Sequence, residues 1–479
     1  MSNLVPLRCS VCGGLLTRNE ALEVSSCPHC EGTHELGDSE YENRGSPGAA
    51  GRLLSFCKAV YGALPKSLRI YVSPVTFFSY KLLNSIRPQV WSIEGEVCGS
   101  PLTISVCLYS TTAQFRNYAG NLIFGTSFRS SYLGSAWVWN TQKVPKGASG
   151  FAMVISETDR PFLRLLSAGC GVLIPAWVQG EAVLPRTHRE KQQLSAKNRY
   201  RKIRQHSLDF EITHDQRLFD DFYDNMLLPH AKQRFGDSAQ VSTRVDAQAD
   251  FDNGELLLVK RQGKYISGQM ITYEDSSMCL RCIGVRDGNL EYVQAGAISA
   301  SYEFALRQAE EKGCRKVKFH FSRAFLRDGV LRFKRTLSQR IVAAHYHKLL
   351  VRIVSDSMAT RAFLENSPFL FERFGKLHGA VFVNGEAPLT LAALRTINKE
   401  HFHAGMSQLV VFQFSPEITN GEGGSAPTRS PEFPAIRSTD PSDPFRFNQL
   451  TRPEWTELIR GLGCTGIGQA VTIYPRHAE

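Results

Sequence analysis

The stretch that decides the fold runs from Phe251 to Lys334 and reads FDNGELLLVKRQGKYISGQMITYEDSSMCLRCIGVRDGNLEYVQAGAISASYEFALRQAEEKGCRKVKFHFSRAFLRDGVLRFK. Its first part contains short runs rich in β-branched and aromatic residues, which are typical of strands. Turn residues separate these runs, because glycine accepts a positive φ and short polar side chains satisfy the backbone of a turn. The pattern therefore predicts three strands joined by hairpins, at Glu255–Lys260, Lys264–Thr272 and Met278–Val285.

A helix and a further strand follow the three strands. From Gly296 onward, apolar residues recur at helical spacing, and Gly313 stands where a helix commonly ends. Residues Arg315–Phe321 then read as one more strand, and Ser322–Arg335 as a basic loop. Because a helix between two strands usually packs on a face of their sheet, we expect an α+β core around a mixed sheet.

This order of elements resembles the core of the GNAT acyltransferase superfamily. The Ser-Arg-x-Phe, Asp-Gly-Val and Phe-Lys run between Ser322 and Lys334 looks like its FemAB/FemX-like branch, as do Phe222–Met226 and Arg234–Asp237 upstream. The resemblance covers roughly Ile174 to Leu337, and weaker similarity continues to about Val411. It implies two GNAT-like mixed-sheet domains in tandem, and an enzyme that forms amides by acyl transfer.

The resemblance also implies the catalytic residues. Lys334 matches the lysine of the Phe-Lys motif, which in Fem-type enzymes lies by the 3′ end of the donor and stabilises the oxyanion of the tetrahedral intermediate. Phe333 would contact the donor beside it. Arg323 could bind a carboxylate or phosphate through its planar guanidinium, and Asp328 could orient it or accept a proton from the attacking amine. The alternatives are that Lys334 is a surface lysine and that Asp328-Gly329 only makes a turn.

Two basic tracts account for much of the net charge of +11. Each tract, 186–206 and 315–335, contains a single acidic residue. Segments this basic attract polyanions, so we expect Lys197, Arg199, Arg201 and Arg204 to bind tRNA. The alternative is a solvated basic face, and a rival function is a non-catalytic nucleic-acid-binding or scaffold protein on a transferase fold.

The acyl donor is predicted from one departure from the superfamily. Coenzyme A-dependent GNAT proteins resemble one another at a glycine-rich turn whose backbone N–H groups hold the pyrophosphate. Residues Gln294–Ala300 have one glycine where that pattern wants two. We therefore expect an aminoacyl-tRNA donor and a small-molecule or peptide amine as acceptor, within a biosynthetic pathway. The alternative donor is acetyl- or acyl-coenzyme A.

The first residues predict a metal site. Cys9 and Cys12, and Cys27 and Cys30, form two CxxC pairs at the spacing of a zinc ribbon. Four thiolates would leave the metal no open position, so the zinc would be structural.

Composition and resemblance together divide the chain into segments. These are a zinc ribbon at 1–35, a linker at 36–51, a degenerate GNAT-like domain at 52–185, a FemAB-like acyltransferase domain at 186–414, a disordered linker at 415–443 and a C-terminal tail at 444–479. We expect a cytoplasmic protein without a membrane partner, because no apolar run approaches the ~20 residues of a membrane helix and the start lacks a secretory signal. The sequence does not predict an oligomeric state.

Overall fold

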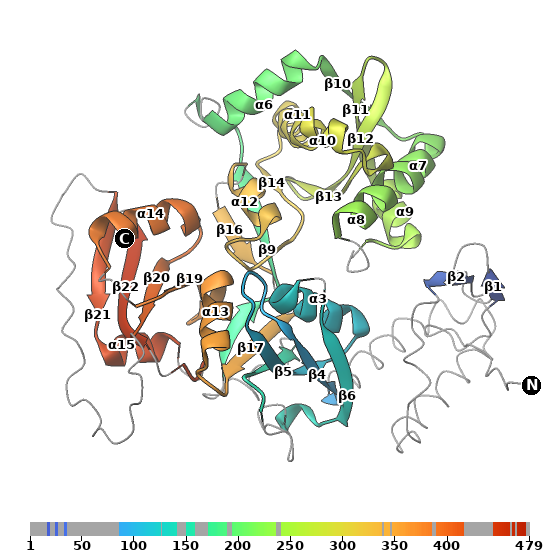
Figure 1. Cartoon of the computed structure of the whole chain (residues 1–479). Coiled ribbons are helices and arrows are strands. Elements are labelled where there is room, and N and C mark those ends of the chain that lie inside the picture. The colour runs from blue at the N-terminus through green and yellow to red at the C-terminus, as the bar shows by residue number, and fades with distance from the viewer. Residues whose placement is uncertain are drawn as a thin grey trace, which may run out of the picture. The chain divides into compact units, whose positions relative to one another are not determined.

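The computed structural model describes most of the chain after residue 85 and three short strands before it. The described ranges are 86–125, 127–140, 150–158, 171–188, 194–235, 241–337, 340–344, 347–385, 389–415, 444–459, 462–464 and 467–475. The chain forms two compact units, Met1–Ile86 and Arg87–Glu479 (Figure 1).

The first unit contains one antiparallel sheet. Its strands are β1 (Thr17–Asn19), β2 (Val24–Ser26) and β3 (Thr33–Glu35). Cys9, Cys12, Cys27 and Cys30 of the predicted zinc ribbon lie outside the described residues, as does the predicted linker at 36–51. The zinc site therefore stays a prediction.

An eight-stranded mixed sheet forms the upper part of the second unit in Figure 1. Its strands are β9 (Trp177–Val183), β10 (Leu208–Thr213), β11 (Gly254–Arg261), β12 (Lys264–Glu274), β13 (Ser277–Val285), β14 (Lys316–Lys318), β15 (Ser322–Arg323) and β16 (Arg340–Ala343). They lie in the order β10-β11-β12-β13-β14-β9-β15, and β16 also pairs with β9. The three predicted strands are thus confirmed as β11, β12 and β13, and β14 returns parallel to β13.

Seven helices described in this part of the chain cover or flank the eight-stranded sheet. They are α6 (Leu194–Gln205), α7 (Gln216–Phe222), α8 (Leu228–Phe235), α9 (Arg244–Asp252), α10 (Leu290–Gln294), α11 (Ala297–Glu311) and α12 (Gly329–Arg335). Side chains alternate across a strand, so the side chains on the two faces of β11 pack in two different hydrophobic cores. Leu257 packs in a cluster with α11, whereas Leu256 packs with Phe219 and Phe222 of α7. The sheet therefore lies between two layers of helices.

An eleven-stranded mixed sheet forms the rest of the second unit. Its strands are β4 (Gln89–Glu96), β5 (Thr103–Ser110), β6 (Arg129–Ser135), β7 (Met153–Thr158), β8 (Val172–Pro175), β17 (Lys348–Ile353), β18 (Phe369–Arg373), β19 (Lys376–Val383), β20 (Gln408–Phe414), β21 (Phe445–Leu450) and β22 (Ile467–Pro475). The order is β21-β22-β20-β19-β18-β8-β17-β7-β5-β4-β6. The described helices in this part are α3 (Ala113–Phe124), α13 (Met358–Asn366), α14 (Leu391–His401) and α15 (Arg452–Leu458).

The later strands correct two expectations about the domains. The strands β17 and β18, which we placed with the second half, pair instead with strands of the first half: β17 lies between β7 and β8, and β18 pairs with β8. The described residues of the segment 444–479, which we expected to be a tail, supply β21 and β22 to the same sheet and form the helix α15 between them. Local pattern could not predict this, because the pairing partners lie far apart in sequence.

The eight-stranded sheet is inserted between two neighbouring strands of the eleven-stranded one. The chain leaves β8 at Pro175 and enters β9 after one fully buried residue, Ala176. It returns at β17, where Lys348 pairs with Pro175 and the Ala176 N–H donates to the carbonyl of His347 at 3.0 Å. No helix among the described residues is long and apolar enough to cross a membrane.

Candidate functional site

The candidate site lies where the parallel strands β13 and β14 separate. They pair only through Ser277–Cys279 and Lys316–Lys318. Beyond this point β13 continues to Val285, while the chain after β14 bonds to β9, the Phe319 N–H donating to Gly180 O at 2.9 Å. The pairing of β12 with β13 also shifts register after Leu280, which gives β13 a bulge. Residues 281–283 are consequently partly exposed, although they lie inside the sheet.

Lys334 of α12 lies at this separation. Its side chain is 3% exposed, and Nζ donates to the carbonyl of His320 and, at 2.9 Å, to that of Phe321. Burial lowers the pKa of Lys334 to about 7; Asp328 acts against this change and the positive charge of Arg234 adds to it. Lys334 is therefore not a surface lysine, and its two protonation states have similar free energies near neutral pH.

Asp328 begins the helix that carries Lys334. Its carboxylate accepts a hydrogen bond from the Leu331 N–H at 2.8 Å, the geometry of a helix N-cap. Residues 329–335, which we expected to be loop, are thus a helix. Asp328 thus caps the helix that carries Lys334, and its negative charge acts to raise the pKa of Lys334.

Arg323 points toward the other sheet. Its guanidinium lies over the ring of Tyr118 in α3, 5.1 Å from the ring centroid. Tyr118 is buried and donates to the carbonyl of Ala176 at 3.0 Å. Tyr118 thus links Arg323 to the connection between β8 and β9, whereas the Lys334 ammonium bonds to the carbonyls of His320 and Phe321.

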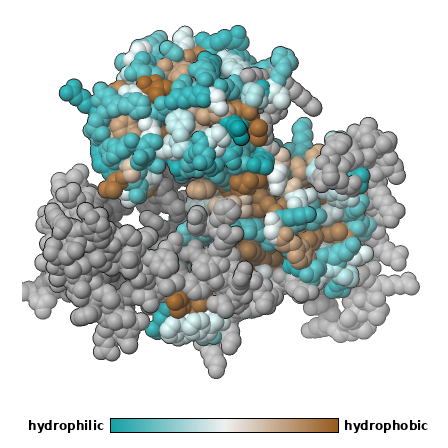
Figure 2. Space-filling view, turned by 180° about the vertical axis from the view of Figure 1, so that it is seen from behind, coloured by the Kyte–Doolittle hydropathy of each residue, from teal (hydrophilic) through white to brown (hydrophobic). Residues whose placement is uncertain are grey.

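Helix α6 separates its basic residues onto two faces. Lys197, Arg201 and Arg204 are exposed, whereas Arg199 is 7% exposed. Arg199 Nε donates to Glu303 of α11 at 3.2 Å. The surface of the lobe built on the eight-stranded sheet is mostly hydrophilic on the side shown in Figure 2. The exposed cations of α6 are available to a polyanion; the charge of Arg199 is directed inward.

Three side chains from the segment before β10 donate hydrogen bonds to Glu303. Besides Arg199, it accepts hydrogen bonds from Arg186 and from the Tyr200 hydroxyl, both at 2.7 Å. Burial acts to raise the pKa of Glu303, but the arginines and Tyr200 outweigh it and lower that pKa below its usual value. Sequence reasoning missed Glu303. The available signal was its position as the one acidic residue between Ala297 and Ala309, opposite a tract with eight basic residues (186, 189, 191, 197, 199, 201, 202, 204).

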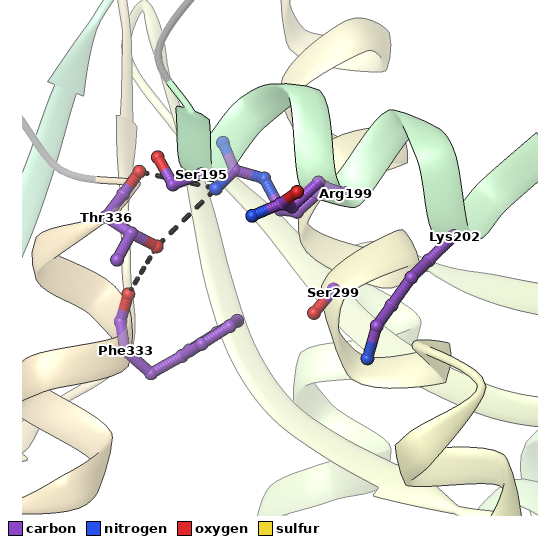
Figure 3. Close-up of a pocket in the computed structure, with 7 residues that line it drawn as sticks. Ser195, Arg199, Lys202, Ser299, Phe333 and Thr336 are labelled. Carbon is purple, nitrogen blue, oxygen red and sulfur yellow. Dashed lines mark hydrogen bonds between the residues drawn. The ribbon is translucent and has the colours of Figure 1, made fainter.

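A cavity of about 220 Å³ lies between α6, the start of α11 and the end of α12 (Figure 3). It is lined by Ser195, Asn198, Arg199, Lys202, Ser299, Phe333 and Thr336. Of the residues predicted to bind the donor, Arg199 and Phe333 line it, and Phe333 directly precedes Lys334. Lys202, which we did not single out, donates to the carbonyl of Gln294 at 2.9 Å.

No metal site is found in the part of the chain that the structure describes, since no three His, Cys, Asp or Glu residues there are grouped to hold an ion. The four cysteines of the predicted ribbon lie outside that part of the chain.

The sequence matches no protein-family model and no curated protein. Among solved structures, FemX gives a TM-score of 0.30 at 11% identity, covering 54% of this chain and 83% of its own. L-PGS from Bacillus licheniformis gives 0.27 at 8% identity, covering 43% and 70%. A GCN5-related N-acetyltransferase from Sphaerobacter thermophilus gives 0.25 at 13% identity, covering 43% and 62%. We assign no activity from similarities of this size.

Proposed function

We propose that the protein is an amide-forming acyltransferase that moves an aminoacyl group from aminoacyl-tRNA to the amine of a small molecule or peptide. The observation that carries the proposal is the buried ammonium of Lys334 at the separation of β13 and β14. A buried cation held by two backbone carbonyls is suited to stabilise an oxyanion, and such preorganised groups contribute several kcal/mol to catalysis.

In the proposed reaction, the acceptor nitrogen attacks the ester carbonyl carbon, and a C–N bond forms. Lys334 stabilises the negative charge that develops on the carbonyl oxygen. The C–O ester bond then breaks, and the proton lost by the amine goes to the departing 3′-oxygen of the tRNA. A pKa of about 7 suits Lys334 to this reaction, because it can donate strongly to the oxyanion near neutral pH.

The exposed cations of α6 support the tRNA donor. Lys197, Arg201 and Arg204 lie on one helix and have exposed side chains, so they can contact consecutive phosphates. Reversing their charges to glutamate should weaken tRNA binding and reduce its dependence on salt, without changing the thermal stability. An unchanged salt dependence would contradict a role for α6 in binding tRNA.

The alternative donor is an acyl-coenzyme A. The feature that favours it is the turn at Gly296, which has a φ of 97° and leads directly into α11 without a side-chain cap. Such a helix start can bind a phosphate through its free N–H groups.

The deciding experiment offers both donors separately: a mixture of charged tRNAs, and labelled acetyl-coenzyme A, each with a panel of amines. We expect transfer from charged tRNA only, and its loss in Lys334→Met. The matched control is Lys376→Met, which removes an exposed lysine at the start of β19. Transfer from the thioester alone would show that the donor is an acyl-coenzyme A and not aminoacyl-tRNA. Full activity of Lys334→Met would refute the proposed role of Lys334.

A further inference from the structure

The cavity between α6, α11 and α12 has the composition of an anion site. Arg199 and Lys202 line it, and none of its seven lining residues is acidic. The charge of Arg199 is partly compensated by Glu303, which it shares with Arg186. Lys202 instead donates to a neutral carbonyl, and the structure shows no carboxylate within ion-pair distance of it among the described residues. The wall formed by α6 therefore keeps a net positive charge.

The lack of a side chain at Gly296 leaves room for Lys202 over the start of α11. A Cβ atom at position 296 would come within 3.1 Å of Lys202 Cδ and 3.2 Å of its Cβ. Figure 3 shows the Lys202 side chain descending from α6 on the same side of the cavity as Ser299. The stem of Lys202 thus lies beside Gly296 while its ammonium donates to the carbonyl of Gln294, which places a cation at the start of α11.

The opposite side of the cavity offers an aromatic ring. Phe333 is partly exposed, and its ring packs edge-on against Tyr302 with centroids 5.5 Å apart. In Figure 3, Phe333 extends from α12 and Arg199 from α6 into the space between these helices. A ring and a planar guanidinium at the two sides of a small cavity suit a flat heterocycle, because bases stack on both kinds of group. Ser195, Asn198 and Ser299 add polar side chains to the lining.

We propose that this cavity binds one phosphorylated nucleoside, its phosphate on Lys202 and its base beside Phe333. The inference rests on the proposed transfer reaction, because Phe333 directly precedes Lys334 and a nucleotide held here belongs to the donor. Most of the lining residues belong to α6, a helix that precedes the predicted core. The nucleotide would therefore be held mainly by side chains and not by backbone N–H groups. Two donors carry such a group: the 3′-terminal nucleotide of tRNA and the adenosine phosphate of coenzyme A.

The test uses adenosine 5′-monophosphate and inorganic phosphate, titrated separately into the full chain by isothermal calorimetry. We expect the nucleotide to bind more tightly than phosphate. Lys202→Ala should weaken nucleotide binding about tenfold, the factor that corresponds to ~1.4 kcal/mol. Lys202→Arg should restore part of it, and Phe333→Leu should weaken the nucleotide but not phosphate. The matched control is Lys264→Ala, which removes an exposed charge at the start of β12.

Each outcome decides the proposal. Equal binding of phosphate and nucleotide would overturn the base contact, and nucleotide binding that is insensitive to Lys202→Ala would overturn the site. Competition identifies the carrier, since deacylated tRNA but not coenzyme A should displace the bound nucleotide if the donor is tRNA. Failure here is separable from failure of the proposed function, because acyl transfer that depends on Lys334 but ignores Lys202 would leave the function standing.

Discussion

Replacing Glu303 by glutamine should destabilise the protein by about 3 kcal/mol. Glu303 is 1% exposed and faces two arginines whose side chains are 8% and 9% exposed. Removing one partner of a buried ion pair typically costs ~3–5 kcal/mol, because a charge is left uncompensated away from water. Arg186 keeps a second carboxylate, Glu310, at 3.1 Å, whereas Arg199 loses the one carboxylate that the structure shows bonded to it. We therefore expect the lower end of that range.

Urea unfolding followed by circular dichroism measures this change. The control is Glu311→Gln, an exposed residue on the same helix, which should shift the free energy of unfolding by no more than ~0.5 kcal/mol. The double variant Glu303→Gln with Arg199→Met should recover part of the loss, because it also removes the unpaired cation. A cost for Glu303→Gln no larger than that of the control would refute the reasoning.

The pH dependence of the free energy of unfolding is a second, independent test of the ion pairs made by Glu303. The pKa of Glu303 is lowered in the folded protein, so its contribution to stability is present above the unfolded value of ~4.3 and is lost as the pH falls through the folded pKa. The glutamine variant should lack this part of the acid destabilisation.

Three further predictions concern other parts of the chain. The folded pKa of Lys334 is about 7, below the unfolded value of ~10.4, so between these two pH values the unfolded chain binds more protons than the folded one. The free energy of unfolding should therefore rise with pH in this window, by on the order of 1 kcal/mol per pH unit. Lys334→Met should abolish this rise in urea titrations at pH 7 to 10, and an unchanged slope would contradict the burial of Lys334. Gly405→Ala should lower stability by more than ~1 kcal/mol, because φ is +100° and a Cβ would lie 2.2 Å from Ile341 O; Gly134→Ala, also at positive φ but with nothing within 4 Å, isolates the contribution of that contact. If Cys9, Cys12, Cys27 and Cys30 bind metal, elemental analysis should find one zinc per chain, and chelation should leave the unfolding transition of Arg87–Glu479 unchanged, since that segment is a separate compact unit.

Local pattern predicted the elements whose signals are local. The strands β11–β13 and helix α11 follow from hydrophobic periodicity and turn residues, and the structure confirms them within a few residues. Helix α12 was missed because Asp328-Gly329 is equally compatible with a turn; the hydrogen bond from Leu331 to Asp328 shows the cap. Local pattern did not predict β16 and β17, because their partners β9, β7 and β8 lie far earlier in the chain.

In the candidate site, too, the features that depend on long-range partners were not predicted from the sequence. Lys334 was chosen by resemblance, but nothing near it in the sequence indicates that it is buried, since its acceptors lie on the turn after β14. Arg199 was grouped with exposed cations because its neighbours on α6 are basic. Its direction is set by Glu303, which is 104 residues away in the chain. Long-range partners of this kind leave no mark on local composition.

The insertion of one sheet into another has a consequence for synthesis on the ribosome. β8 emerges before any residue of 177–343, but its neighbour β17 emerges after all of them. The segment with Lys334 can therefore begin to fold on the nascent chain, while β7 and β8 keep unsatisfied edges until the C-terminal strands leave the exit tunnel. A stalled or prematurely released chain would expose those edges, and we expect such products to depend on chaperones.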